Sequence, residues 1–196
     1  MSKRQHIKAQ RQQKKRNDKL ILVGIVVVAL VLFGLLILPN LLPKAAISRP
    51  NVQGLAMGNP NAPVKVEQFS DFLCSHCADY ALNTEAEIVK EYIATGKVYM
   101  KYIPTPFMGE SSVLAAEGSY CASDQNKFWE FHDVLYQNQS NYTVTSLVTL
   151  AGRAKLDKTT FKTCLESGKY KQQVTDALAY AGTKGVTGPP SVLITD

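Results

Sequence analysis

The feature of this 196-residue chain that most restricts its fold is an uncharged apolar run over residues 20–38. A helix over this run rises about 1.5 Å per residue and is roughly 28 Å long, close to the ~30 Å hydrocarbon core of a bilayer. A helix packed on a soluble core presents a polar face, and this run has none. The sequence therefore predicts a transmembrane helix over 20–38. The alternative is a cleaved signal peptide, whose apolar region is usually shorter, at about 7–15 residues.

The positive charge of the chain is concentrated ahead of this run. Residues 1–19 hold one acid, Asp18, and eight bases, namely Lys3, Arg4, Lys8, Arg11, Lys14, Lys15, Arg16 and Lys19. They sum to +7 while the whole chain carries +6, so the remaining residues sum to −1. By the positive-inside rule this predicts a single-pass protein of the cell membrane, with its N-terminus in the cytoplasm and its main domain outside. A near-neutral domain disfavours nucleic acid as its ligand, because neutralising phosphates needs a basic patch.

The rest of the chain has the pattern of an α/β domain. Residues 39–57 are predicted to be a linker, and the turn residues of GNPNAP (58–63) begin a domain over 58–196. Strands are expected at 64–69, 98–103 and 191–195, because these segments are rich in β-formers. A helix is expected over 79–94 and a helical block over about 108–182, with the segments 113–121, 127–136, 145–151, 157–168 and 169–181. Since Asp196 directly follows the last strand and leaves a sheet edge uncovered, a further strand and helix are expected beyond this sequence.

The segment Cys74-Ser75-His76-Cys77 lies between a predicted strand and a predicted helix, a context that indicates a redox pair. At the first turn of a helix, Cys74 faces unpaired backbone N–H groups and the positive end of the helix dipole, which both favour a thiolate. His76 can add a positive charge or a hydrogen-bond donor. Cys74 is therefore expected to be the exposed, unusually acidic nucleophile, and Cys77 the buried resolving thiol. A stabilised thiolate favours the reduced form, so the disulfide is a stronger oxidant.

A metal site is the main alternative for this pair. Cys74, Cys77 and His76 are soft ligands that suit a copper-handling module, whereas a structural zinc site needs four ligands and generally two close pairs. Cys121 and Cys164 are isolated in the sequence, and His132 lies in a predicted helix, where it is expected to be structural. A redox role is therefore favoured over a metal site and over an inert pair. No cofactor is indicated, because no phosphate-cradling glycine-rich loop is present.

The second pair, Cys121 and Cys164, lies in the helical block. An oxidising compartment favours a structural disulfide between them. Free buried thiols and an electron relay stay open, because the sequence does not show whether the Cα atoms come within the ~4.4–6.8 Å that a disulfide requires.

Four blocks resemble the DsbA-like family of thiol–disulfide oxidoreductases, especially its BdbD-type branch: GNPNAPVKVEQFSDFLCSHC, YCASDQNKFWEFHDVLYQNQ, FKTCLESGKY and GVTGPPSVLI. The resemblance covers about residues 54–196 and implies a thioredoxin-like fold with a helical domain inserted after the second strand. It implies that Pro190 is the family's cis-proline beside the active-site cysteines, although an ordinary turn proline is the alternative. It also implies disulfide formation in exported proteins and reoxidation by a membrane partner of the DsbB or VKOR type. The same chemistry run in reverse, as a reductase or isomerase, is the closest rival.

Three positions depart from the family pattern. Ser75 stands where the family often has proline or glycine. Gln68 stands where a buried acid is common, and Glu67, one residue earlier in an alternating strand, is expected to face the other side. Pro189, before the cis-proline, has no N–H to donate, so fewer backbone hydrogen bonds to substrates are expected, with the Pro189 carbonyl left as an acceptor.

Overall fold

The computed structural model describes residues 19–35 and 47–196, which belong to two compact units, residues 1–45 and 46–196. Residues 19–35 are helical, and their large apolar side chains are exposed all along the helix. Among the described residues, no helix combines the length and apolar character needed to cross a membrane. Residues 36–38 of the predicted span and the basic residues before 19 lie outside the described part. The transmembrane helix therefore stays a prediction.

The second unit is built on a four-stranded sheet of order β1-β3-β2-β4, with β1 (Ala56–Gly58), β2 (Val64–Ser70), β3 (Val98–Pro104) and β4 (Ser191–Thr195). The central strands β2 and β3 are parallel, whereas β1 and β4 pair antiparallel to β3 and β2. Parallel neighbours require a crossover connection, and the helical residues 75–93 supply it. The three strands predicted from the sequence are confirmed.

The predicted domain boundary at residue 58 is wrong. Ala56, Met57 and Gly58 pair with β3 as β1, and Met57 is completely buried. Arg49, also assigned to the linker, has only 4% of its side chain exposed. A three-residue strand that ends in glycine is too short to show an alternating pattern, so the sequence carried no signal for it.

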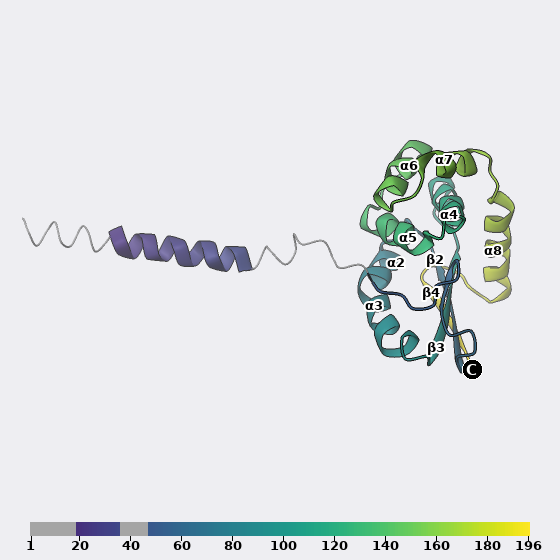
Figure 1. Ribbon diagram of the computed structural model, residues 1–196, viewed down its shortest axis with the longest axis horizontal. Helices are drawn as coiled ribbons and strands as arrows, with labels where there is room; N and C mark the ends of the chain where they lie inside the picture. The colour runs from purple at the N-terminus through teal and green to yellow at the C-terminus, as the bar shows by residue number, and fades with distance from the viewer. Residues whose placement is uncertain (1–18, 36–46) are drawn as a thin grey trace, which may run out of the picture. The chain divides into compact units, whose positions relative to one another are not determined.

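The helices lie on both faces and at one end of this sheet. The crossover runs without a break through α2 (Ser75–Asp79), the π-helical turn η1 (Tyr80–Thr84), α3 (Glu85–Ile88) and a second π-helical turn η2 (Val89–Ile93). The predicted helical block is confirmed as α4 (Glu110–Ser123), α5 (Phe128–Gln137), α6 (Val144–Arg153), α7 (Lys158–Glu166) and α8 (Lys171–Thr183). Helices α2 and α3 cover one side of the sheet and α8 the other, while α4 to α7 gather at one end (Figure 1).

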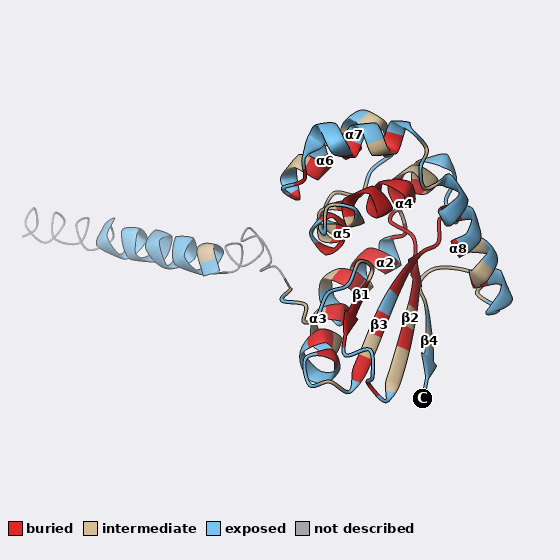
Figure 2. Cartoon of the chain, turned by 45° about the vertical axis from the view of Figure 1, so that its right-hand side comes forward, coloured by how far each residue is buried: buried red, intermediate tan, exposed pale blue. Residues whose placement is uncertain are grey.

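The sheet and the helical insertion share one core. Tyr102 of β3 is fully buried, and its ring centroid lies 5.4 Å from that of Phe128 and 6.2 Å from that of Trp129, both in α5. Figure 2 shows the buried residues concentrated where β2 and β3 meet α4 and α5, in contrast to the exposed edge strand β4. The end of β2 is therefore enclosed both by the sheet and by the insertion.

Candidate active site

The Cys74–Cys77 segment follows β2 at the end of the strand that faces the helical insertion. Cys74 is the N-cap residue of α2, and its carbonyl accepts a hydrogen bond from the backbone N–H of Ala78 at 3.1 Å. Its side chain makes no capping hydrogen bond. The N–H groups of the first helical turn therefore donate no hydrogen bond to the Cys74 side chain.

The two cysteines differ in burial. Both are free thiols; Cys77 has no exposed surface and Cys74 is 7% exposed. Burial raises the pKa of Cys77 to about 12, and hydrogen bonding to the Asp71 backbone and the Ser70 hydroxyl acts against it. Cys77 is thus a protonated thiol at neutral pH, as a buried resolving cysteine should be. The expectation of an exposed Cys74 is wrong: Cys74 is buried, and the loop that enters β4 contacts its sulfur.

That loop carries the two prolines singled out by the sequence. The Pro189–Pro190 bond is cis, so the cis-proline prediction is confirmed. The Cys74 Sγ atom donates a hydrogen bond to the Pro189 carbonyl oxygen at 3.6 Å. Since proline has no N–H, this carbonyl is the one backbone hydrogen-bonding group of Pro189, and it contacts the first cysteine.

The side of β2 that faces Cys77 carries an amide where the family often has an acid. Gln68 is fully buried; its Nε2 donates to the Ser70 hydroxyl at 3.3 Å, and its Oε1 has no hydrogen-bond partner among the residues that the structure describes. Glu67 faces the opposite side of the sheet, where the Tyr180 hydroxyl lies 2.9 and 2.8 Å from its carboxylate oxygens. The prediction that Glu67 faces the side of the sheet away from the cysteines is confirmed.

His76 lies in the first turn of α2 and is exposed. Its side chain has no hydrogen-bond partner within the part of the chain that the structure describes. Its effect on Cys74 therefore stays a prediction.

Two further residues hold the turn before Cys74, and sequence reasoning missed both. The Asp71 carboxylate is 1% exposed and accepts hydrogen bonds from the backbone N–H groups of Leu73, Phe107 and Met108 at 2.8, 2.6 and 3.0 Å, and from the Ser112 hydroxyl. An aspartate that bonds the N–H two residues later is a common turn feature, so its position after a strand was an available signal.

Gln139 is the second missed residue. It follows α5, and its Nε2 donates to the carbonyl oxygens of Phe72 and Cys74 at 2.8 and 2.9 Å. No pattern in the sequence links it to residues more than 60 positions earlier.

A buried charged cluster fixes the segment that precedes β1. The Arg49 guanidinium bonds Glu85 Oε1 at 3.0 and 2.7 Å and the Asp133 carboxylate at 2.9 and 2.7 Å, and lies 4.6 Å from the centre of the Trp129 ring. His132 Nδ1 lies 2.9 Å from Asp133 Oδ1. His132 is buried, as a structural residue should be, and its acidic neighbours are the adjacent Asp133 and the distant Glu85.

The second cysteine pair is a disulfide. Cys121 of α4 and Cys164 of α7 are bonded, with Cα atoms 5.9 Å apart. The structure therefore supports the structural disulfide among the three alternatives.

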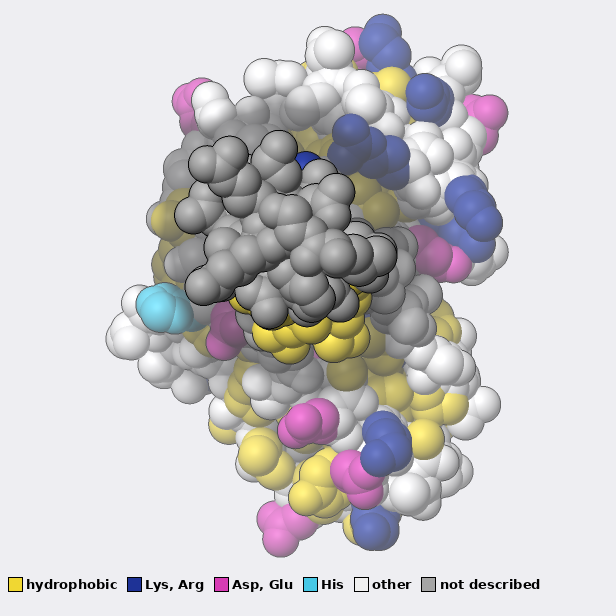
Figure 3. Space-filling model, turned by 90° about the vertical axis from the view of Figure 1, so that its left-hand side faces the viewer, with side chains coloured by type: hydrophobic (Ala, Val, Ile, Leu, Met, Phe, Trp, Pro, Cys, Tyr) yellow, Lys and Arg dark blue, Asp and Glu magenta, His cyan; other side chains and the backbone are white. Residues whose placement is uncertain are grey.

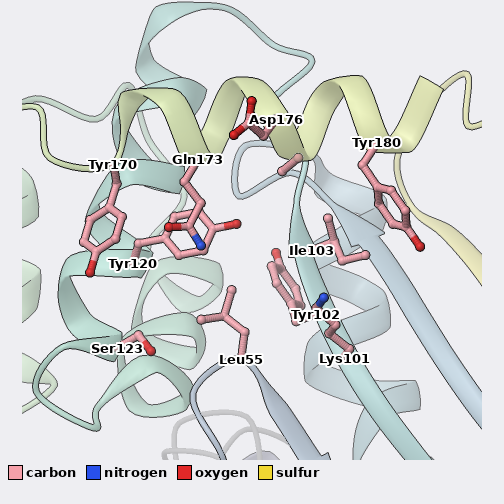
Figure 4. A pocket seen from close by; sticks show the side chains of 11 residues that line it. Leu55, Lys101, Tyr102, Ile103, Tyr120, Ser123, Tyr170, Gln173, Asp176 and Tyr180 are labelled. Atoms are coloured by element: carbon pink, nitrogen blue, oxygen red, sulfur yellow. The ribbon is translucent and has the colours of Figure 1, made fainter. Parts of the chain in front are cut away.

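A cleft of about 410 Å³ between α8, α4 and β3 contains none of the site residues predicted from the sequence (Figure 4). It is lined by Leu55, Tyr120, Tyr170, Gln173 and Asp176, among others. Within the described ranges, no group of three or more His, Cys, Asp or Glu side chains is arranged to hold a metal ion. Acidic and basic side chains are interspersed on the face shown in Figure 3, as expected for a domain of low net charge.

Known proteins share both this sequence pattern and this fold. A family model described as thioredoxin matches residues 50–196. A probable disulfide bond formation protein D of Bacillus cereus is 34% identical over 148 residues, which cover 71% of this chain and 68% of the relative.

The crystal structure of oxidised BdbD from Bacillus subtilis superposes with a TM-score of 0.67 and 26% identity, over 79% of this chain and 88% of that one. Chlamydia trachomatis DsbA, at 19% identity and a TM-score of 0.66 over 78% of this chain and 87% of its own, shares the fold. Since the family match takes in nearly the whole second unit, the chain belongs to the thioredoxin family, among its DsbA-like, BdbD-type thiol–disulfide oxidoreductases.

Proposed function

We propose that this protein is an extracytoplasmic thiol oxidase, which introduces disulfides into exported proteins through Cys74 and Cys77. Family membership establishes thiol–disulfide chemistry, and the oxidising direction is the proposal. The observation that carries it is the position of Cys74 as the N-cap of α2, with Cys77 buried one turn further on.

The direction of electron flow follows from the difference between the two thiols. The N–H groups and dipole of the helix beginning at Ser75 favour negative charge on Cys74. The pKa of about 12 keeps Cys77 protonated. A thiol that is stable as a thiolate is a good leaving group, so a mixed disulfide with Cys74 is readily released and the reduced enzyme is favoured.

The reaction transfers two electrons. A substrate thiolate attacks Cys74 Sγ in the Cys74–Cys77 disulfide; the S–S bond breaks and Cys77 departs and takes up a proton. A second substrate thiolate then attacks the substrate sulfur of the mixed disulfide, and Cys74 leaves as a thiolate. The substrate dithiol is oxidised to a disulfide while the enzyme disulfide is reduced to a dithiol. The Pro189 carbonyl, beside Cys74, is positioned to accept a backbone N–H from the bound substrate.

The dithiol must be reoxidised, and we assign that step to a membrane reoxidase of the DsbB or VKOR type. The same proposal places residues 20–38 in the cell membrane, with the N-terminus in the cytoplasm and the catalytic domain outside. Two observations support the anchor: the exposed apolar side chains along the helical residues 19–35, and the +7 charge of residues 1–19.

The test uses the full chain in detergent micelles with a reduced, unfolded protein that carries two cysteines. The account predicts stoichiometric disulfide formation and a reduction potential closer to ~−120 mV than to ~−270 mV. Cys74→Ser should abolish the reaction. Cys77→Ser, with Cys74 first converted to its mixed disulfide with glutathione, should exchange glutathione for the substrate thiol and accumulate a mixed disulfide with the substrate through Cys74. The double variant Cys121→Ala/Cys164→Ala is the control that should retain the reaction. A potential near ~−270 mV, with net reduction of substrate disulfides, would show that the enzyme is a reductase or isomerase.

A further inference from the structure

One side chain from the helical insertion reaches the backbone of the redox turn. Gln139 lies directly after Asn138, the C-cap residue of α5. The amide nitrogen of glutamine carries two hydrogens, and here one is donated to the Phe72 carbonyl at 2.8 Å and the other to the Cys74 carbonyl at 2.9 Å. The donor capacity of this amide is therefore fully used on the turn that carries the first cysteine.

The loop that presents Gln139 is itself fixed at both ends. The Asn138 carboxamide oxygen accepts a hydrogen bond from Arg153 Nη1 in the last turn of α6 at 2.6 Å. On the other side, the Tyr142 backbone N–H donates to the Ser111 hydroxyl at the start of α4 at 2.5 Å. The loop that carries Gln139 is thus fixed by α4, α5 and α6, which hold the Gln139 side chain in position against the redox turn.

The two carbonyls that it binds are those that decide where the Cys74 sulfur points. Cys74 has extended backbone angles, φ −73° and ψ 120°, and the chain becomes helical at Ser75. The Phe72 carbonyl belongs to the peptide group before Leu73, and the Cys74 carbonyl to the peptide group after Cys74. Because peptide groups are planar, hydrogen bonds to both carbonyls restrict the backbone between them, including the Cα atom of Cys74 that carries its side chain. Since no side-chain cap stabilises this N-terminus, the Gln139 contacts supply a restraint that the helix lacks.

We infer that Gln139 is a positioning residue for Cys74. Through it, the helical insertion holds the backbone that carries the Cys74 sulfur at the N-terminus of α2, where the N–H groups of the first turn favour a thiolate. The inference rests on the proposed function, in which Cys74 is the reacting sulfur. It gives the insertion a part in the redox chemistry of the thioredoxin-like unit.

The test removes the two N–H donors of the Gln139 carboxamide and changes the side chain as little as possible. Gln139→Glu keeps the shape of the side chain, but its carboxylate has no N–H and turns lone pairs toward two carbonyl oxygens. Gln137→Glu is the matched control, because Gln137 is exposed at the end of α5, two residues earlier, and the substitution adds the same charge. Gln139→Met removes the donors without adding charge. Near-ultraviolet circular dichroism and thermal unfolding establish that each full-length variant is folded.

The readouts are the alkylation rate of Cys74 against pH in the reduced protein, located by peptide mass, and the equilibrium constant with glutathione. Both Gln139 variants should move the alkylation midpoint to higher pH and make the enzyme less oxidising by about three- to tenfold, the factor that one ordinary hydrogen bond represents. Gln137→Glu should stay within about twofold of the wild type, since surface charge effects are small.

The outcomes separate this inference from the proposed function. If the wild-type midpoint lies below that of a free cysteine and both folded Gln139 variants keep it, the positioning role is overturned and the oxidase proposal stands. If Gln137→Glu and Gln139→Glu shift the midpoint equally while Gln139→Met does not, the effect is one of charge, and the inference is again overturned. If the wild type itself reacts like a free cysteine, the proposed function fails first.

Discussion

The Sγ atom of Cys74 lies 3.6 Å from the carbonyl oxygen of Pro189, to which it donates a hydrogen bond across 115 residues of chain. The pairing of β2 with β4 brings these segments together, since Phe69 lies opposite Ser191. The register of the sheet therefore sets the distance between the first cysteine and the proline loop. An incoming substrate must take over this contact, because the same carbonyl also limits the exposure of Cys74.

Pro189→Thr tests the part played by this loop. The variant adds a backbone N–H, so one more hydrogen bond to an extended substrate is expected, worth about 1 kcal/mol or roughly a fivefold longer life of the mixed disulfide. The lifetime is measured by acid quenching and mass spectrometry in a Cys77→Ser background, in which Cys74 is first converted to its glutathione mixed disulfide so that the substrate thiol displaces glutathione. Pro60→Thr, an exposed proline before the opposite end of β2, is the control. Unchanged lifetimes and unchanged rates of substrate oxidation would contradict this account of Pro189.

Asp71→Asn tests the support beneath the redox turn. The Asp71 carboxylate accepts hydrogen bonds from three backbone N–H groups and from the Ser112 hydroxyl. The amide of the variant has only one acceptor oxygen, and its NH₂ group would face some of these donors, which would then lose their acceptor. We expect a loss of about 2–4 kcal/mol in the free energy of unfolding, since each buried donor left unpaired costs about 1–3 kcal/mol. Urea denaturation of the reduced protein measures it. Asp79→Asn, at an exposed position of α2, should change stability by less than about 0.5 kcal/mol; equal effects of the two variants would refute the assignment.

Removal of the Cys121–Cys164 disulfide should lower the stability of the folded protein without changing its rate of substrate oxidation. The two cysteines are 43 residues apart, so the chain-entropy model gives at most about 4 kcal/mol of stabilisation. Cys121→Ala/Cys164→Ala should lower the free energy of unfolding by up to that amount and leave the rate of substrate oxidation at low temperature within about twofold of the wild type, because neither cysteine lies in the redox turn. Mass spectrometry of the unreduced wild type should show the linked peptides. Loss of oxidation in a folded double variant would instead indicate an electron relay.

The Arg49 cluster predicts a component of acid sensitivity. Burial alone opposes ionisation of Asp133, but hydrogen bonds from His132 and Arg49 outweigh it and lower the pKa of Asp133 from 3.8 to about 2. A carboxylate with a depressed pKa contributes stability that is present above pH 4 and is lost as the pH falls toward 2. The contribution is of order 2 kcal/mol.

The measurement compares the free energy of unfolding of the wild type and Asp133→Asn from pH 5 to pH 2. The difference between them should shrink by about that amount over this range, whereas Asp79→Asn should follow the wild type throughout. A pH-independent difference would show that Asp133 is not held as a carboxylate by Arg49 and His132.

Much of the fold could be predicted because its signals are local. The alternation of 64–69, the run of β-formers in 98–103 and 191–195, and the helical spacing of Phe128, Phe131 and Leu135 each point to elements that the structure contains. Asp157 begins the predicted segment 157–168, and its side chain caps α7 by accepting a hydrogen bond from the Thr160 N–H, which is a local signal of a helix start. The cysteine pair was identified by a motif and its context, and the cis-proline by resemblance.

The unpredicted features depend on contacts between residues far apart in the chain. Gln139 reaches residues 65 and 67 positions earlier, and Arg49 pairs with acids 36 and 84 positions later. The limited exposure of Cys74 depends on a loop 115 residues away. None of these relationships leaves a periodic pattern in the sequence, so they become visible only when the sheet register and the helix packing are known.

The central claim is that the helix beginning at Ser75 makes Cys74 the reactive thiolate of the pair. It is tested most directly by the pH dependence of alkylation of Cys74 in the reduced, full-length wild type, with the labelled peptide identified by mass. The account predicts that Cys74 is labelled at lower pH than Cys77, which stays unlabelled through the neutral range because burial raises its pKa. Labelling of Cys77 before Cys74, or labelling of both cysteines over the same pH range, would contradict it.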